Sequence, residues 1–447
     1  MKKSLIFALV ALAINGSSLF AFAEEKILLK DAIKYAFDNN NTIKAIKSSL
    51  SASERDIGIA KSNIMPKLKA EEAFVSTNNP GQAFMFKIDQ RNFTPADLAG
   101  APNTFNNPGV VNNFLTGVTL EQPIYSRKAN ISIAMAKKEY SAQGYQYLRK
   151  QEELAQKVSQ TYLLINTAQE FLYVAQQGIT DAKEHLRVAQ VRYKSGLGLY
   201  SDVLRAQTAL SSAEQTCVSA QKNLNVAKRA LGLLLGKQTS VDIAEIVPEL
   251  KLKNADYYND LSQYRTDIKA MQLNVENSKN NIKLANSAIF PTIGTLASYQ
   301  LYDSKTPFGT EGHNYIAGAF LKWDIFDGNQ RKYETLKAKD KSAEAKEYLE
   351  GLKQAVSYKV FDSYSSVEEA AKNVELACAA AKSAEEGQRL VLKRWQNSLS
   401  SFVDLLDAQT NLDKARADVV KSHNHYKASL INLSFESGIL LKELGLE

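Results

Sequence analysis

The segment YKSGLGLYSDVLRAQTAL, residues 193–210, recurs in altered form as WQNSLSSFVDLLDAQTNL, residues 395–412. Aligned without a gap, the two copies share an aromatic first residue, a leucine at the fifth position, the triplet Ala-Gln-Thr and the final leucine. In each copy a polar turn precedes a serine or aspartate that can cap a new helix. The segment therefore predicts a tight turn between two helices, which the chain contains twice.

Long coiled-coil helices are predicted to lead into both turns. Within the helix predicted over residues 127–194, large side chains recur every seven positions from residue 158 to residue 193, and small residues follow three positions later. The large residues are Val158, Ile165, Leu172, Ile179, Leu186 and Tyr193. Residues 330–396 continue the pattern with Val360, Val367, Val374 and Ala381. A heptad sustained over this length is typical of coiled coils, and the small residues let the helices approach closely.

A helix that ends at a proline, followed by two alternating segments, also occurs twice. The first helix is predicted over residues 28–64, before Pro66, and its counterpart over residues 267–290, before Pro291. The alternating segments are residues 68–74 and 114–125 in the first copy, and 293–301 and 315–323 in the second. Each pair predicts a β-hairpin that is apolar on one face. Residues 77–113, rich in Asn, Pro and Gly, are predicted to form a long irregular connection.

The fold is thus predicted to be mainly α with a small β portion. It is a tandem repeat, and each repeat contains long antiparallel coiled-coil helices and one β-hairpin. Residues 1–23 have the charged start, the apolar core and the Ala-x-Ala cleavage site of a signal peptide. The first structural repeat is then predicted to span residues 24–253, and the second residues 254–447.

Charge and composition exclude several classes of protein. Without the predicted signal peptide, 53 Lys and Arg face 48 Asp and Glu in an interspersed pattern, so we expect no nucleic-acid partner. No catalytic motif or cofactor fingerprint occurs, so we expect no enzymatic activity, no catalytic residues and no cofactor. His423 and His425 would face different sides of a helix, so no metal site is expected.

The two cysteines, Cys217 and Cys378, each lie roughly 20 residues from a turn. This places them at a similar height along the predicted helices, where a disulfide is one interpretation. Buried free thiols are the interpretation that we favour, because free cysteine behaves as a small apolar residue.

The predicted strands need partners from outside the chain. Four strands cannot close a barrel, and a sheet that faces lipid must close. Oligomerisation is therefore expected. A signal peptide together with strands that are apolar on one face fits a bacterial outer membrane.

The duplicated unit resembles the TolC family of outer-membrane channels. The resemblance rests on the order helix, proline, hairpin and long helix, on the Tyr-x-x-Gly-Leu turn and on the Asp-Val-Leu-x-Ala-Gln helix start. It implies a homotrimer with one shared membrane β-barrel in outer-membrane lipid and a periplasmic helical tunnel. It also implies a passive duct of a tripartite efflux pump or type I secretion system, working with a periplasmic adaptor and an inner-membrane transporter.

The resemblance also implies roles for residues near the turns. Asp404 and Asp407, three apart on one side of a helix, would form acidic rings at the tunnel entrance. In the family, an Asp–Arg pair holds the entrance closed. Asp202 would be the aspartate of this pair, but Ser400 occupies the position of the arginine. Trp395 stands where a tyrosine is usual. From spacing alone, capping and a solvated helix face explain the two aspartates of the predicted rings equally well.

The turn residues would contact the adaptor. They are Tyr193, Gly196 and Leu197 in the first copy, and Ser398 and Leu399 in the second. The first turn keeps the Gly-Leu pattern of the family, whereas the second has serine in place of glycine, which leaves its geometry open. The simpler explanation of the same residues is a tight turn alone. An alternative for the whole chain is a periplasmic coiled-coil adaptor or scaffold protein of a transport complex, which would have one helical hairpin and no duplicated strand pair.

Overall fold

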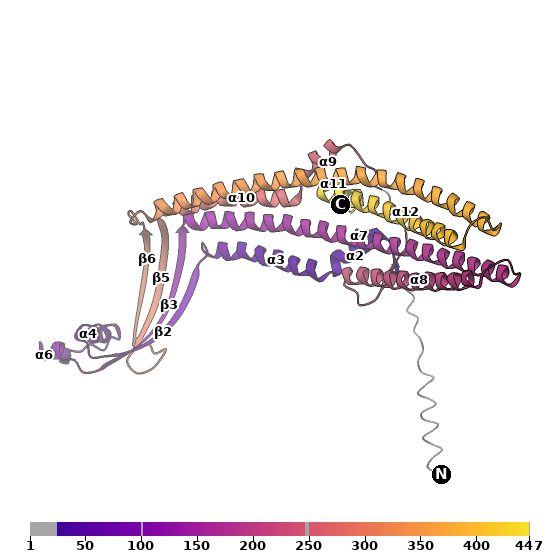
Figure 1. The fold of residues 1–447 in the computed structure, drawn as a ribbon. Helices are drawn as coiled ribbons and strands as arrows, with labels where there is room; N and C mark the ends of the chain where they lie inside the picture. The colour runs from indigo at the N-terminus through magenta and orange to yellow at the C-terminus, as the bar shows by residue number, and fades with distance from the viewer. Residues whose placement is uncertain (1–24, 100–101, 246–249, 447) are drawn as a thin grey trace, which may run out of the picture. The chain divides into compact units, whose positions relative to one another are not determined.

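The computed structural model describes residues 25–99, 102–245 and 250–446 (Figure 1). The predicted signal peptide, residues 1–23, lies outside the described residues. The chain forms two compact units. The tip unit comprises the segments up to Ala45, Leu148–Arg265 and Ala355–Glu447, and the sheet unit comprises Ile46–Tyr147 and Thr266–Gln354. Each unit takes segments from both predicted repeats.

The sheet unit contains one antiparallel sheet with the strand order β2-β3-β5-β6. Its strands are β2 (Lys67–Thr77), β3 (Val111–Tyr125), β5 (Thr292–Asp303) and β6 (Gly312–Lys322). The two predicted hairpins therefore lie side by side, with Val118 of β3 opposite both Ala70 of β2 and Tyr299 of β5. Strands β2 and β6 each pair on one side only, so the sheet has two open edges.

One face of the sheet is apolar and the other is more polar. On the apolar face Phe74 contacts Phe114, with ring centroids 4.7 Å apart, and Tyr315 is exposed. On the opposite face the hydroxyl groups of Thr119 and Ser298 are hydrogen-bonded at 2.9 Å. The alternation in the sequence therefore places apolar side chains on one side of the sheet, where a single chain leaves them uncovered.

The prediction of an irregular connection over residues 77–113 is wrong, because this segment contains three short helices. They are α4 (Pro80–Asp89), α5 (Pro95–Ala99) and α6 (Asn103–Asn106). Asn79 caps α4 by accepting a hydrogen bond at 3.2 Å from a backbone N–H of the first turn. Phe84 then packs edge-on against Phe93 and Phe105, so an aromatic cluster orders the segment.

The long helices have the predicted bounds. They are α7 (Arg127–Lys194) and α11 (Gln330–Gln396), and each contributes to both units. The sheet unit also contains α10 (Thr266–Ala285) and the 3-10 turn η1 (Asn286–Ile289). No helix among the described residues is both long and apolar enough to span a membrane.

The predicted single helix over residues 28–64 is wrong, because the chain breaks at Asn40 into α2 (Leu29–Asn39) and α3 (Asn41–Ser62). Asn40 has an extended backbone with ψ of 128°. Its side-chain oxygen accepts hydrogen bonds from the backbone N–H groups of Thr42 and Ile43, at 2.9 and 3.4 Å. Asn40 therefore caps the start of the second helix, and the apolar spacing alone does not reveal this break.

In the tip unit, the two turns are followed by α8 (Tyr200–Leu234) and α12 (Phe402–Glu436). The unit also contains α2, α9 (Ala255–Ser262) and α13 (Leu440–Glu443). The short strands β1 (Glu25–Ile27) and β4 (Val241–Ile243) form a parallel pair that the sequence patterns do not indicate. Three residues are too few for an alternating pattern to be recognised.

The adaptor alternative requires a single helical hairpin and no duplicated strand pair. The chain instead contains two helical hairpins, α7–α8 and α11–α12, and two strand pairs that join in one sheet. The architecture therefore contradicts that alternative.

Both cysteines are free thiols, as favoured above, but their predicted burial is wrong. Cys217 is half-buried and Cys378 is exposed, with its Sγ 3.8 Å from Nε2 of His423. Within one chain little covers this part of α11, since residues 371–380 are exposed or half-buried throughout.

Candidate functional site: the paired helical tips

The first turn ends α7 with a Schellman motif. The N–H of Gly196 donates to the carbonyl of Tyr193 at 3.0 Å, and the N–H of Leu197 donates to the carbonyl of Arg192 at 2.9 Å. This motif places one residue after the helix in a left-handed conformation. Gly196 is that residue, with φ of 72°. Glycine adopts this conformation without steric strain.

The second turn ends α11 with the same motif, although it contains no glycine. The N–H of Ser398 donates to the carbonyl of Trp395 at 3.0 Å, and the N–H of Leu399 donates to the carbonyl of Arg394 at 2.8 Å. Ser398 takes the left-handed conformation with φ of 62°. That conformation costs a residue with a side chain roughly 1–2 kcal/mol. The geometry that the sequence left open is therefore the same in both turns.

The ends of the two turns present apolar side chains to solvent. Leu197 is 71% exposed and Leu399 is 68% exposed. Tyr193 is also exposed, and its ring lies 5.3 Å from the ring of Tyr200 at the start of α8. Exposed leucines at matching positions of two adjacent turns form a surface that an apolar partner can cover.

Behind the turns, the two helical hairpins share one apolar core. Trp395 is only 4% exposed, and its ring lies 5.2 Å from the ring of Phe402. The buried residues of this core come from α7, α8, α11 and α12; they are Ala189, Val203, Ala206, Trp395, Phe402 and Leu405. The two turns are therefore packed as one body, with Trp395 inside the chain rather than at its surface.

Arg192 links the two turns, a role that the sequence analysis missed. Its Nη1 donates to the carbonyl of Gln396 at 2.6 Å, and its Nη2 donates to Oγ of Ser398 at 2.8 Å and to the carbonyl of Leu197 at 3.2 Å. The guanidinium also lies 5.2 Å from the centre of the Trp395 ring. Arg192 at the end of α7 thus holds the end of α11.

The chemistry of this link favours arginine. Gln396 is the last residue of α11, so its carbonyl belongs to the negative end of the helix dipole. A guanidinium has several donors in a fixed fork and can also stack on an aromatic ring. The one available signal in the sequence is that Arg192 and Arg394 occupy matching positions of the two copies. Arg394 instead donates within its own turn, to the carbonyl of Leu399 at 3.5 Å, and lies near enough to Asp404 to lower its pKa.

Asp404 caps α12. Its carboxylate accepts the backbone N–H of Ser401 at 2.9 Å, and the Ser401 hydroxyl accepts the backbone N–H of Asp404 at 3.1 Å. These reciprocal bonds form a capping box. The hydrogen bond from the Ser401 N–H holds the pKa of Asp404 below its ordinary value. The capping explanation considered above therefore applies to Asp404, whose carboxylate nevertheless remains exposed.

The other residues expected at the entrance lie near the same two turns. Asp407 is exposed one turn after Asp404 on α12. Asp202 is half-buried in the first turn of α8 and forms no ion pair within the described part of the chain. The hydroxyl of Ser400 reaches only the carbonyl of Val391, at 3.5 Å. Among the described residues no hydrogen bond or ion pair joins these three.

A buried polar cluster lies deeper in the tip unit, around Gln409. This residue is 7% exposed. Its Nε2 donates to Asp181 at 3.1 Å and to Asp413 at 3.0 Å. Its Oε1 accepts from Gln388 at 3.0 Å and lies 3.1 Å from Nε2 of His185. One amide thus joins α7, α11 and α12.

The charge of this cluster is partly balanced by Arg416. Its guanidinium donates to Asp181 at 3.0 Å and lies 3.9 Å from Asp413. Burial nevertheless raises the pKa of Asp413, and the nearby Asp181 carboxylate raises it further, against the opposing effects of Gln409 and Arg416. A raised pKa means that Asp413 favours folding most at low pH. Its contribution to stability falls as the pH rises through its pKa in the folded chain.

Replacing Gln409 with leucine is expected to loosen the packing of α12. The change leaves two carboxylates without their shared donor, which lowers the free energy of local opening of α12 by about 2 kcal/mol. Amide hydrogens that exchange by local opening should then exchange roughly 30-fold faster. Hydrogen–deuterium exchange measured on peptides from α12 checks this. The matched control is Gln207→Leu, because Gln207 occupies the same position in the first copy but is exposed. Equal exchange in both variants would refute a special role for Gln409.

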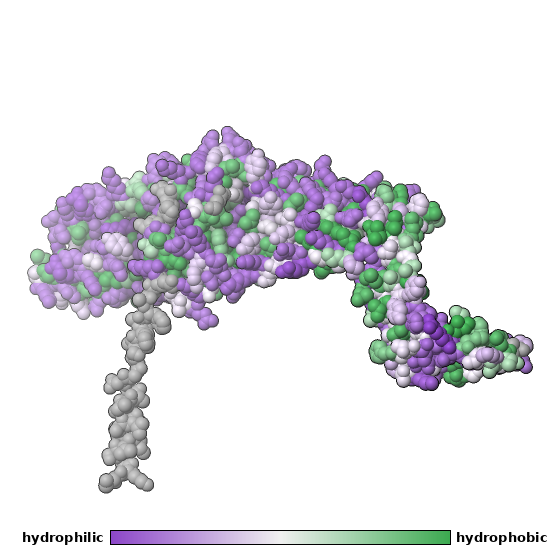
Figure 2. All heavy atoms as spheres, turned by 180° about the vertical axis from the view of Figure 1, so that it is seen from behind, coloured by the Kyte–Doolittle hydropathy of each residue, from purple (hydrophilic) through white to green (hydrophobic). Residues whose placement is uncertain are grey.

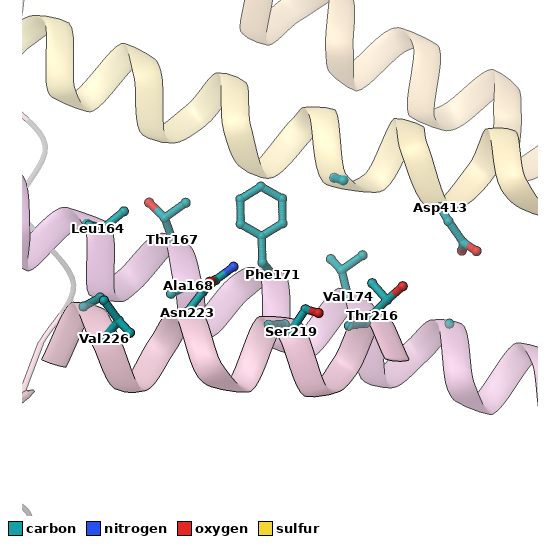
Figure 3. Close-up of a pocket in the computed structure, with 15 residues that line it drawn as sticks. Leu164, Thr167, Ala168, Phe171, Val174, Thr216, Ser219, Asn223, Val226 and Asp413 are labelled. Atoms are coloured by element: carbon teal, nitrogen blue, oxygen red, sulfur yellow. The ribbon is translucent and has the colours of Figure 1, made fainter. Parts of the chain in front are cut away.

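An apolar pocket of about 720 Å³ adjoins this cluster between α7, α8 and α12 (Figure 3). Leu164, Phe171 and Val174 of α7 line it along its length; Leu164 lies near Val226 of α8 at one end, and Asp413 of α12 lies at the other. Alanines, threonines and a glycine supply much of the remaining lining. Small side chains let another helix approach closely, so this surface suits helical packing.

Comparisons with known proteins give one consistent result. A family model described as "Outer membrane efflux protein" matches residues 32–237 and 257–438. The outer membrane efflux protein BepC of Brucella suis biovar 1 (strain 1330) is 22% identical, covering 100% of this chain and 92% of that protein. The outer membrane protein TolC of Escherichia coli (strain K12) is 20% identical, covering 98% and 87%. The solved structure of VceC from Vibrio cholerae has a similar fold, with a TM-score of 0.74 at 15% identity over 94% of this chain and 97% of that chain.

Proposed function

The chain belongs to the outer membrane efflux protein family, and from this premise we propose that it assembles as a homotrimer that forms a passive export duct. Three four-stranded sheets close one barrel in the outer membrane, and the helices continue it through the periplasm. Two features support this arrangement: the open edges of β2 and β6, and the uncovered apolar face of the sheet. A second copy of the chain on each side pairs with the free backbone N–H and C=O groups of the edge strands. Lipid covers the apolar face.

The proposed function rests mainly on one observation, that the two turns of the chain are packed together as one body. Their leucines are exposed while the core behind them is closed. We propose that the exposed leucines dock a periplasmic adaptor, and that the adaptor connects the duct to an inner-membrane transporter. Proteins of this family are channels rather than enzymes, so the energy for export comes from the transporter.

The entrance of the duct lies at these turns. Asp404 and Asp407 of three copies form the acidic rings that favour cations. Asp202 has no arginine at position 400 to pair with. The link from Arg192 to the end of α11 holds the second turn closed in place of that pair. Adaptor docking opens the entrance by breaking the link from Arg192, so that the tips dilate.

Replacing both Asp404 and Asp407 with asparagine is expected to weaken block of the channel by multivalent cations at least tenfold, because the charge of both rings is lost. Single-channel recording in planar bilayers, with a trivalent cation added from the side of the turns, measures the block. The control is Asp256→Asn with Asp260→Asn, which removes the same charge from exposed positions on α9. An unchanged block in the first variant would reject the acidic rings.

A further inference from the structure

Exposed aromatic residues surround the place where the strands of the sheet unit meet its helices. They are Tyr125 at the end of β3, Phe290 before β5, Trp323 and Phe326 after β6, and Tyr333 in the first turn of α11. The indole N–H of Trp323 donates to the carbonyl of Ile289 at 3.1 Å. Figure 2 shows hydrophobic residues gathered over the strands and the adjoining helix ends. Such a belt marks the level of the lipid headgroups in outer-membrane barrels.

Just beyond this belt, α7, α10 and α11 enclose a pocket of about 360 Å³. Asn281, Leu284 and Ala285 of α10 line it, with Lys128 of α7 and with Lys337 and Lys341 of α11. The three helices are fixed around it by hydrogen bonds. The hydroxyl of Ser278 lies 3.0 Å from that of Ser342, and Asn277 donates to the carbonyl of Met135 at 3.2 Å.

The pocket is basic. Lys337 and Lys341 are four residues apart and project from the same side of α11, and Lys128 reaches the pocket from the first turn of α7. Lys341 pairs with Glu344 at 2.6 Å, whereas Lys128 and Lys337 have no acidic partner among the described residues. Glu334 also lines the pocket, and it accepts a hydrogen bond from Gln330 at 2.8 Å. Two lysines without an acidic partner among the described residues therefore line the pocket beside an apolar floor.

The pocket lies at the periplasmic border of the headgroup layer. Lys128 is three residues beyond the end of β3, and Lys337 is seven residues into α11, which is about 10 Å along the helix. The headgroup layer on each side of a bilayer is roughly 5–8 Å thick, so Lys128 lies within its depth, whereas Lys337 lies just beyond it and extends its long side chain back toward it. Basic pockets between helices at this level bind anionic headgroups. The apolar floor formed by Leu284 and Ala285 suits the glycerol and first acyl carbons.

We propose that this pocket binds the phosphate of an anionic phospholipid from the inner leaflet of the outer membrane, one lipid for each chain. Lys128 and Lys337 neutralise the phosphodiester, and Asn281 donates to a headgroup oxygen. The inference rests on the proposed placement of the sheet in the outer membrane. It adds a specific lipid partner at the junction between the barrel and the periplasmic helices.

The test is lipid binding by the full chain, purified in a neutral detergent and stripped of lipid. Native mass spectrometry measures binding of dioctanoyl phosphatidylglycerol, with dioctanoyl phosphatidylcholine and inorganic phosphate as separate arms. We expect phosphatidylglycerol to bind about fivefold or more tightly than phosphatidylcholine. Replacing Lys128 and Lys337 with glutamine should weaken phosphatidylglycerol binding about tenfold. The control variant carries Lys339→Gln and Lys346→Gln, which remove two exposed charges from the opposite side of α11.

Phosphatidylglycerol binding that survives in K128Q/K337Q, or that falls equally in the control, would overturn the proposal. Inorganic phosphate that displaces phosphatidylglycerol at equal concentration would assign the pocket to free phosphate instead. Conductance in bilayers of phosphatidylcholine separates this inference from the proposed function. A wild-type protein without channel activity refutes the duct, whereas a conducting protein without lipid preference refutes only the lipid site.

Discussion

Replacing Leu197 and Leu399 together with glutamate is expected to reduce export at least 100-fold. Both leucines are among the most exposed apolar residues of the chain, so the change should leave the fold and the trimer intact. In the variant, however, an adaptor that docks on the turns would bury two glutamate carboxylates in each chain, and neither carboxylate would have a partner of opposite charge. Burying an unpaired charge costs several kcal/mol, which is enough to prevent docking. Accumulation of a fluorescent efflux substrate in cells that depend on this channel measures the effect.

The matched control for this variant is Leu197→Met with Leu399→Met, which keeps apolar side chains of similar size at both turns. It should export normally. Trimers of both variants must be recovered from the outer-membrane fraction in wild-type amounts. Normal export by the glutamate variant under these conditions would show that the exposed leucines do not dock a partner.

Replacing Arg192 with alanine is expected to raise the single-channel conductance several-fold. The variant loses the hydrogen bonds to Gln396 and Ser398 and the contact with the Trp395 ring. Hydrogen bonds from charged groups contribute about 1.5–3 kcal/mol each when buried. Because this link is partly exposed, we expect a combined effect of about 2 kcal/mol, which shifts the balance between closed and open turns roughly 30-fold.

Two further variants locate the origin of this effect. Arg394→Ala removes the arginine at the matching position, which donates to its own turn and not to the other one among the described residues, and should leave the closed state of the turns unchanged. Arg192→Lys keeps the charge but loses the fork of donors, so an intermediate conductance is expected. Equal conductance in R192A and wild type would mean that the entrance is held closed elsewhere, for example around Gln409.

Regular features of the fold were predictable from the sequence because they depend on local pattern. The heptads indicated the long helices α7 and α11, and alternation identified four strands with one apolar face. The repeated segment located both turns. The break at Asn40 and the helices around Phe84 escaped prediction, because they depend on single capping side chains and on one aromatic cluster.

The contacts at the tips were harder to predict because they join segments some 200 residues apart. Arg192 contacts residues near position 398, and Gln409 contacts Asp181 and His185. Each copy has an arginine and a glutamine at matching positions, yet only one of each pair makes these contacts. The sequence repeat therefore indicated which positions are equivalent, whereas packing between the copies determines which of them is used.

Single-channel recording of the purified protein in planar bilayers tests the central claim most directly. A trimeric duct closed at its turns predicts small conductance steps in the wild type and steps several-fold larger in Arg192→Ala. It also predicts block by a trivalent cation only from the side of the turns, and this block should be lost in the D404N/D407N variant. A folded trimer that gives no conductance steps, or identical steps and block in all three proteins, would contradict the account.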